Sequence, residues 1–145
     1  MNRFLLIGTL LLSTTLHAKD KAQDIADVQH VMDTFHQAVV SHDGAALAAL
    51  FIPAGSTWLN VLASEGKIRV GSYQDFANFV SRSKDNLDPR HSHVRIQSDG
   101  VIASAYFDFV FLINGKAENR GSETWQLVKG ADGWRIAALT YSSNP

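Results

Sequence analysis

The chain has 145 residues, no cysteine, and 13 Lys and Arg against 14 Asp and Glu, which gives a formal net charge of −1. The absence of cysteine excludes disulfide, thiolate-zinc and thiol-redox chemistry. The charges are scattered and form no basic stripe, which argues against nucleic acid or an anionic membrane as a partner.

The first 18 residues have the pattern of a secretory signal peptide. A short basic start is followed by an apolar core over Phe4–Leu12 and by the small residue Ala18, although Leu16 is bulkier than the residue usual at its position. The apolar run is shorter than the ~20 residues that span a bilayer. We therefore expect an exported protein, periplasmic or secreted, cleaved after Ala18, with a single domain over residues 19–145.

The N-terminal part of this domain has helical patterns. Apolar residues at three- and four-residue spacing predict a first helix over residues 24–41. Asp43 is placed to N-cap a short second helix. The buried face of that second helix is expected to carry Leu47, Leu50 and Phe51.

Strand patterns follow, with one more helix between them. Two short strands are predicted over residues 55–61 and 68–70, and Ser72 opens a third helix with the spacing of a capping box. Residues 86–90, which include a proline, are expected to form a loop.

The C-terminal third of the chain reads as a ladder of antiparallel strands. Asp99-Gly100 and Asn114-Gly115 are strong hairpin signals, because both central residues of a type I′ turn need a positive φ. The strands are predicted over His91–Ser98, Val101–Ile113, Lys116–Lys129 and Trp134–Ser143. The whole pattern predicts an α+β domain with one curved sheet.

This order of elements resembles the nuclear transport factor 2-like superfamily, in particular its SnoaL-like members. The resemblance is carried by Ala38–Phe51, by Thr57-Trp58 and by the ending Gly121–Ser142, which includes Asp132–Ile136. It implies a cone, in which three helices pack on a strongly curved antiparallel or mixed sheet around an apolar pocket, often in a homodimer. The superfamily includes isomerase-, cyclase-, dehydratase- and epoxide hydrolase-like enzymes together with non-catalytic binding domains, so the fold does not select an activity.

Regular two-residue hairpins would place a polar set of side chains on one sheet face. Side chains alternate along a strand, and these hairpins would set Asp108 opposite His91 and opposite Gly121. The set that shares this face is His91, His93, Tyr106, Asp108, Glu123 and Trp125. Trp58 and Asn60 on the first strand would add to the rim of the pocket.

The opposite face competes with this assignment, because it is the more hydrophobic of the two. It carries Phe107, Phe109 and Phe111, and burial alone would turn it toward the helices and leave the polar set in water. Bulges, which reverse the parity of a strand, would also change the assignment. Both arrangements remain open at this point.

Asp108 is the main catalytic candidate, because it is the only acid in a strand otherwise made of aromatic and aliphatic residues. An apolar wall would raise the pKa of its carboxyl group and make it a general base, with His91 to orient it and Tyr106 as oxyanion donor. The alternative is an exposed Asp108 or one neutralised by His91. Two histidines with one carboxylate are a weak metal signal, and we predict neither metal nor cofactor.

Three functional hypotheses follow. The leading one is an exported domain that binds a small apolar molecule in the cone, with substrate contacts from Trp58, Asn60, His93, Glu123 and Trp125. The second is a cofactor-independent isomerase, cyclase or dehydratase that uses Asp108 as general base. The third is a non-catalytic interaction domain that dimerises through the Phe107, Phe109 and Phe111 face.

Overall fold

The computed structural model describes the backbone of residues 10–53 and 55–144 and the side chains from Asp20 onward. Its helices and strands follow the predicted order, in an α+β arrangement of three helices and six strands over these residues. They are α1 (Leu10–Val40), α2 (Gly44–Ala48), β1 (Thr57–Leu62), β2 (Lys67–Gly71), α3 (Tyr73–Arg82), β3 (Leu87–Ser98), β4 (Ile102–Ile113), β5 (Lys116–Gly130) and β6 (Gly133–Ser143).

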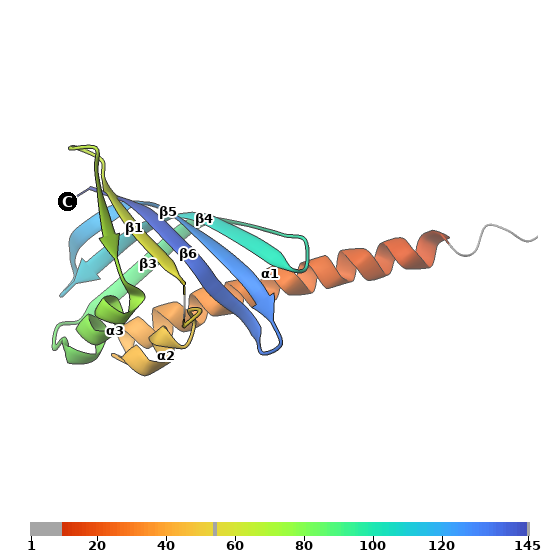
Figure 1. Cartoon of the computed structure of the whole chain (residues 1–145), viewed down its shortest axis with the longest axis horizontal. Coiled ribbons are helices and arrows are strands. Elements are labelled where there is room, and N and C mark those ends of the chain that lie inside the picture. The colour runs from red at the N-terminus through yellow and green to blue at the C-terminus, as the bar shows by residue number, and fades with distance from the viewer. Residues whose placement is uncertain (1–9, 54, 145) are drawn as a thin grey trace, which may run out of the picture.

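The six strands form one mixed sheet in the order β2-β1-β6-β5-β4-β3. Strand β1 pairs with β6 in parallel, and the other neighbours are antiparallel. The sheet twists over α1, while α2 and α3 lie at one end of the same face (Figure 1). The expected architecture of three helices on a curved sheet is confirmed.

Helix α1 begins at Leu10, well before the predicted start at residue 24. No glycine or proline interrupts residues 10–40, so nothing in this stretch breaks the helix. The predicted signal peptide lies partly outside the described residues, which begin at Leu10, and its cleavage stays a prediction. None of the helices in the described segments is both long and apolar enough to cross a membrane.

The two short helices begin at their predicted caps. The Asp43 side chain accepts a hydrogen bond of 2.8 Å from the backbone N–H of Ala46 at the start of α2. Ser72 accepts one of 3.0 Å from the backbone N–H of Asp75 at the start of α3. Each cap satisfies a donor that the first helical turn would leave without a partner.

Strand β3 begins at Leu87, so it includes residues 87–90 of the segment 86–90 that was expected to form a loop. Pro89 lies inside this strand and is the register partner of Phe111 on β4. Since β3 is at the edge of the sheet, a residue without a backbone N–H can be tolerated there. The extension brings Pro89 alongside α1, where its carbonyl oxygen lies 2.6 Å from Nδ1 of His36.

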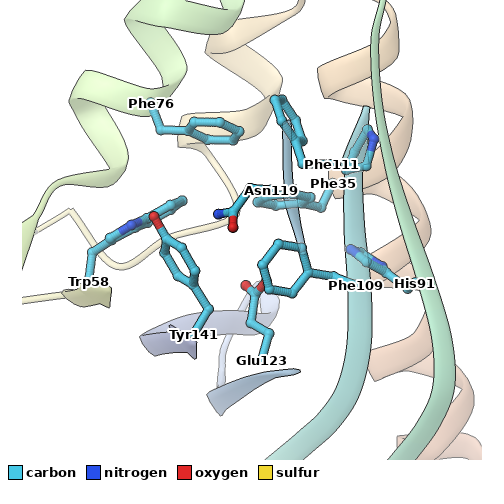
Figure 2. Close-up of a pocket in the computed structure, with 10 residues that line it drawn as sticks. Phe35, Trp58, Phe76, His91, Phe109, Phe111, Asn119, Glu123 and Tyr141 are labelled. Atoms are coloured by element: carbon cyan, nitrogen blue, oxygen red, sulfur yellow. The ribbon is translucent and has the colours of Figure 1, made fainter. Parts of the chain in front are cut away.

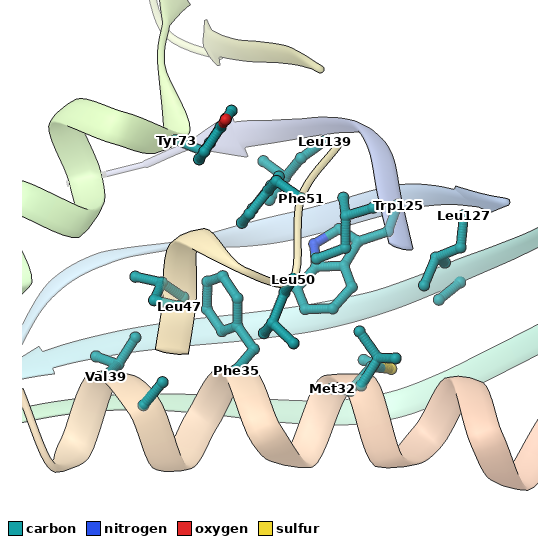
Figure 3. Packing of buried hydrophobic residues seen from close by; sticks show 14 of the residues in the cluster. Met32, Phe35, Val39, Leu47, Leu50, Phe51, Tyr73, Trp125, Leu127 and Leu139 are labelled. Carbon is teal, nitrogen blue, oxygen red and sulfur yellow. The ribbon is translucent and has the colours of Figure 1, made fainter. Parts of the chain in front are cut away.

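The hydrophobic core lies between the helices and the inner face of the sheet (Figure 3). Helix α1 contributes Met32, Phe35 and Val39, at the predicted helical spacing. The sheet contributes Phe107 and Trp125, both fully buried, whose rings contact edge to face at 5.4 Å. The aromatic face of β4 is therefore interior and cannot be the dimer interface of the third hypothesis, which is wrong on this point.

Gly121 on β5 is held against the backbone of β6. A Cβ at this position would lie 2.1 Å from the carbonyl oxygen of Ser142, a distance that neither strand can accept without moving. Since Gly121 is two residues from Glu123, this close approach lies near the part of β5 that carries Glu123.

We expect Gly121→Ala to lower the free energy of unfolding by about 1–3 kcal/mol, because the added methyl group forces a backbone shift. Gly130→Ala in the same strand is the matched control, since its Cβ would meet nothing closer than 3.8 Å. Urea denaturation of both variants measures the difference. Equal stabilities for the two alanine variants would contradict the close approach.

Candidate functional site

A cavity of about 120 Å³ opens between the sheet and the helices (Figure 2). Aromatic rings dominate its wall, and the few polar groups come from β3, β5 and β6. The lining residues are Phe35, Trp58, Phe76, Pro89, His91, Phe109, Phe111, Asn119, Glu123 and Tyr141. Helix α1 supplies Phe35, α3 supplies Phe76, and the sheet supplies the rest.

Glu123 is the one carboxylate among these lining residues. It is 9% exposed, and the indole N–H of Trp125 donates a hydrogen bond of 2.5 Å to its Oε1. Burial disfavours the charged form and raises the pKa of Glu123 to about 7, although the hydrogen bond from Trp125 acts in the opposite direction. The carboxyl group can therefore both accept and release a proton near neutral pH.

His91 lies beside the cavity among aromatic rings. Its imidazole centroid is 4.5 Å from that of Phe107 and 6.0 Å from that of Trp125. Burial lowers the pKa of His91 to about 4, with a further lowering by His36 and an opposing effect of Asp33. The imidazole is therefore neutral at pH 7.

Asn119 and Tyr141 complete the polar part of the wall. The amide of Asn119 lies at the cavity (Figure 2). The hydroxyl of Ser143 donates a hydrogen bond of 2.9 Å to its Oδ1 and holds the amide in place. Burial raises the pKa of Tyr141, and the nearby Glu123 adds to this rise. The phenol of Tyr141 therefore stays protonated and can donate a hydrogen bond.

The predicted polar set does not share one face of the sheet. Asp108 pairs with Ser122 rather than with Gly121, so Glu123 and Trp125 share the inner face with Phe107 and Phe109. The cause is a bulge in β5, where Glu118 has no partner on β4 and reverses the parity of the strand. The predicted common face is therefore wrong.

A second bulge separates the two histidines. In β3, His93 and Val94 together oppose Phe107 alone, and His93 has a φ of 52°. Beyond this bulge His91 pairs with Phe109 and turns inward, while the side chain of His93 is 81% exposed. Among the described residues, no group of three His, Cys, Asp or Glu is arranged to hold a metal ion.

Asp108 lies on the outer face of the sheet, with its side chain 50% exposed. It accepts hydrogen bonds from His93, at 3.0 Å, and from the hydroxyl of Ser122, at 2.9 Å. These bonds, that of His93 foremost, lower the pKa of Asp108. Asp108 is therefore open to water and stays ionised, which is the opposite of the raised pKa expected for a general base.

The remaining predicted residues divide between the two faces. Trp58 lines the cavity, and Trp125 lies beneath it as the partner of Glu123. Tyr106 is exposed on the outer face, where the guanidinium of Arg95 lies 5.0 Å from its ring centroid. Asn60 is not among the lining residues, and its buried Oδ1 has no hydrogen-bond partner in the described part of the chain.

Sequence reasoning missed seven of the ten lining residues as site residues. The alternation of Phe107, Phe109 and Phe111 was the available signal, because three large rings on one strand face demand burial. Tyr141 was missed because Ala137 is an extra residue in β6, which reverses the parity of that strand. The full set of missed side chains is Phe35, Phe76, Pro89, Phe109, Phe111, Asn119 and Tyr141.

The opposite shifts of Glu123 and His91 predict the pH dependence of stability. For Glu123, the pKa of about 7 in place of 4.5 stabilises the fold at low pH, and this contribution is lost as the pH rises from 4.5 to 7. For His91, the pKa of about 4 in place of 6.5 gives stability above pH 6.5 that is lost as the pH falls to 4. Between pH 4.5 and 6.5 the two contributions oppose each other.

We therefore expect Glu123→Gln to lose stability relative to wild type as the pH falls from 6.5 to 4.5, by about 1.4 kcal/mol per pH unit. His91→Gln should gain stability relative to wild type over the same interval. Urea denaturation at several pH values gives the difference in the free energy of unfolding between each variant and wild type. The other carboxylates are the same in both proteins, so their contributions cancel in this difference. A Glu123→Gln curve parallel to that of wild type would show that Glu123 titrates normally.

Comparison with known proteins supports the fold. No protein-family profile matches the chain, and no curated protein matches it. Solved structures do. An NTF2-like protein with a cystatin-like fold from Novosphingobium aromaticivorans is similar over 96% of this chain and 92% of its own, at 14% identity and a TM-score of 0.70. The resemblance to NTF2-like proteins is thereby confirmed for the fold, and the SnoaL-like subgroup stays a prediction.

Two further structures show the range of this fold. An NTF2-like protein of unknown function from Shewanella baltica covers 86% of this chain and 96% of its own, at 19% identity and a TM-score of 0.66. A protein from Streptomyces avermitilis, described as a candidate dehydratase of the NTF2-like family, covers 86% and 98%, at 16% identity and a TM-score of 0.68. At these identities the similarity concerns the fold alone.

Proposed function

We propose that this chain, on the cystatin-like fold of NTF2-like proteins, binds a small and largely apolar molecule in the aromatic cavity, where Glu123 is the polar group that orients it. The observation that carries the proposal is a buried carboxyl group at a cavity whose wall is otherwise mostly aromatic. Burying an ionisable group costs free energy, and no basic side chain hydrogen-bonds Glu123 in the described structure. An apolar pocket with a few convergent polar groups is the usual form of a ligand site.

The size of the cavity restricts the ligand. An apolar cavity of about 150 Å³ is known to bind benzene, so a cavity of about 120 Å³ accepts one small ring or a group of similar size. Neutral His91 and protonated Tyr141 present no charge to the ligand near pH 7. The only group of the wall that changes charge near that pH is Glu123.

The three tryptophans allow a direct test. Trp58 lines the cavity and Trp125 bonds to Glu123, whereas Trp134 is buried elsewhere in the core. We expect phenol, used as a neutral single-ring probe, to shift the indole N–H signals of Trp58 and Trp125 in a saturable manner and to leave that of Trp134 in place. Titration by ¹⁵N-¹H NMR measures these shifts.

Two variants sharpen this test. Asn119→Phe adds bulk to the cavity wall and should weaken phenol binding, whereas Asp108→Asn on the outer face should leave it unchanged. Saturation that survives in Asn119→Phe would place the probe outside the cavity. The absence of any shift in wild type, both with phenol and with the aliphatic alcohol 3,3-dimethylbutan-1-ol, would reject the proposed function.

A second candidate function is proton transfer, with Glu123 as general base in place of Asp108. The pKa of about 7 at Glu123 favours it, because a general base is most effective when its pKa lies near the working pH. The amide of Asn119 and the phenol of Tyr141 could donate to an oxyanion formed on a carbonyl substrate. Among the similar structures, those described as a candidate dehydratase and a candidate aromatic ring hydroxylase fit an enzymatic use of the fold.

Hydrogen–deuterium exchange tests this candidate without knowledge of the substrate. If Glu123 acts as a base, the protein in D₂O should accelerate exchange at the carbon next to the carbonyl of a small ketone such as cyclohexanone, and the rate should rise through about pH 7. Glu123→Gln should return the rate to that of buffer. A wild-type rate equal to that of buffer at pH 8 would reject Glu123 as a base for such substrates.

A further inference from the structure

The aromatic side chains of the cavity form a connected series of rings around its interior (Figure 2). Neighbouring ring centroids are 5.3 Å apart for Trp58 and Phe76 and 6.3 Å apart for Trp58 and Tyr141. The series runs from Phe35 through Phe76, Trp58 and Tyr141 to Phe109, with Phe111 packed edge to face against Phe76 at 6.1 Å. A ligand in the cavity is therefore surrounded by ring surfaces from both helices and sheet.

The charge of this wall has one sign. Among its lining residues, Glu123 is the one acid, and neither lysine nor arginine is present. The pKa of His91, lowered to about 4 by burial, and the raised pKa of Tyr141 keep both groups neutral. Above pH 7 the cavity holds a carboxylate, and no lining side chain carries the opposite charge. In a buried site of low dielectric constant, the attraction between this carboxylate and a bound cation is only weakly screened.

We propose that the cavity selects a small alkylated ammonium ion, whose positive charge is faced by the aromatic rings and balanced by the carboxylate of Glu123. This inference rests on the proposed function, because it names the class of ligand for the same site. Ring faces carry negative quadrupole charge and attract cations, and rings arranged as a cage recognise methylated ammonium groups.

The alkylated form is favoured over other cations by the shortage of acceptors. A primary ammonium group brings three N–H donors, each of which needs an acceptor after it leaves water. The one charged acceptor of the wall is the Glu123 carboxylate, whose Oε1 already accepts from Trp125, and Oδ1 of Asn119 already accepts from Ser143. The other acceptors of the wall are neutral, a ring nitrogen of His91 and the hydroxyl oxygen of Tyr141. A quaternary ammonium ion brings no donors and presents an apolar surface, which suits a wall of rings. A metal ion would need further ligands that the wall lacks.

The experiment compares choline with 3,3-dimethylbutan-1-ol, a neutral molecule of the same shape in which carbon replaces the charged nitrogen. Both are titrated into the protein at pH 8 with the indole N–H signals of Trp58 and Trp125 as readout. We expect choline to bind roughly tenfold more tightly than the neutral alcohol. Choline affinity should fall between pH 8 and pH 6 as Glu123 gains a proton, and the affinity of the alcohol should stay constant.

Two of the other groups near the site, His91 and Tyr141, do not produce this pH profile. His91 is neutral throughout the range, and Tyr141 is protonated throughout it. The titratable groups that face Glu123 are His91 on β3 and Tyr141 on β6. Asp33 and His36 on α1 act on His91, and Arg69 on β2 acts on Tyr141. A fall in choline affinity that is absent in Glu123→Gln is therefore assigned to Glu123.

Three variants complete the test. Glu123→Gln should bind both molecules equally, whereas Asp108→Asn, which removes a carboxylate from the outer face, should keep the preference for choline. Trp58→Leu should weaken the binding of choline more than that of the alcohol. This variant tests the contribution of the aromatic rings while Glu123 stays in place. An unchanged preference in both Glu123→Gln and Trp58→Leu would overturn the proposal.

The wild-type result separates this proposal from the one it rests on. If the alcohol binds as tightly as choline or more tightly, the ammonium proposal is wrong and the binding function stands. If neither molecule binds and phenol does not bind, both proposals are wrong.

Discussion

Burial of the aromatic face of β4 against the helices is the constraint on which the rest of the structure depends. Phe107 is fully buried and contacts both Trp125 and His91, which in turn lie near Phe35 of α1. Rings of this size contribute much of the apolar area that a small domain can bury. The opposite orientation of β4 would expose them to water, so this face of the strand must point toward the helices. Once Phe107 faces inward, its register partner Glu123 must face inward as well.

The chemistry of the site follows from that placement. A carboxyl group carried into the core by its strand loses its hydration, and the indole of Trp125 replaces only part of it. The raised pKa of Glu123 and the lowered pKa of His91 have the same origin, since burial favours the uncharged form of each. Asp108, one residue along the strand from Phe107, meets water instead and behaves as an ordinary ionised carboxylate.

The order of elements could be predicted from the sequence, because it depends on local signals. Asp43 and Ser72 cap their helices as expected, and the Asn114-Gly115 turn joins β4 and β5 as a two-residue hairpin in which Ile113 pairs with Lys116. The Asp99-Gly100 turn, expected to be a regular two-residue hairpin as well, has four residues, since Ser98 pairs with Ala103. The composition of the site could not be predicted, because it depends on parity over a whole strand. The extra residue Glu118 has no local signature, and each such residue exchanges the two faces beyond it.

The bulge at Glu118 also bears on how the site can change in evolution. If Glu118 instead paired with Phe111 in a regular ladder, β5 would shift by one residue against β4, so that Ser122 would face Phe107 and Glu123 would turn to the outer face. A one-residue slip of this ladder would thus replace the acid of the site with the hydroxyl groups of Ser122 and Thr124, without any substitution in the strand. Proteins with this fold can in this way acquire different ligands while the helices and the outline of the sheet stay the same.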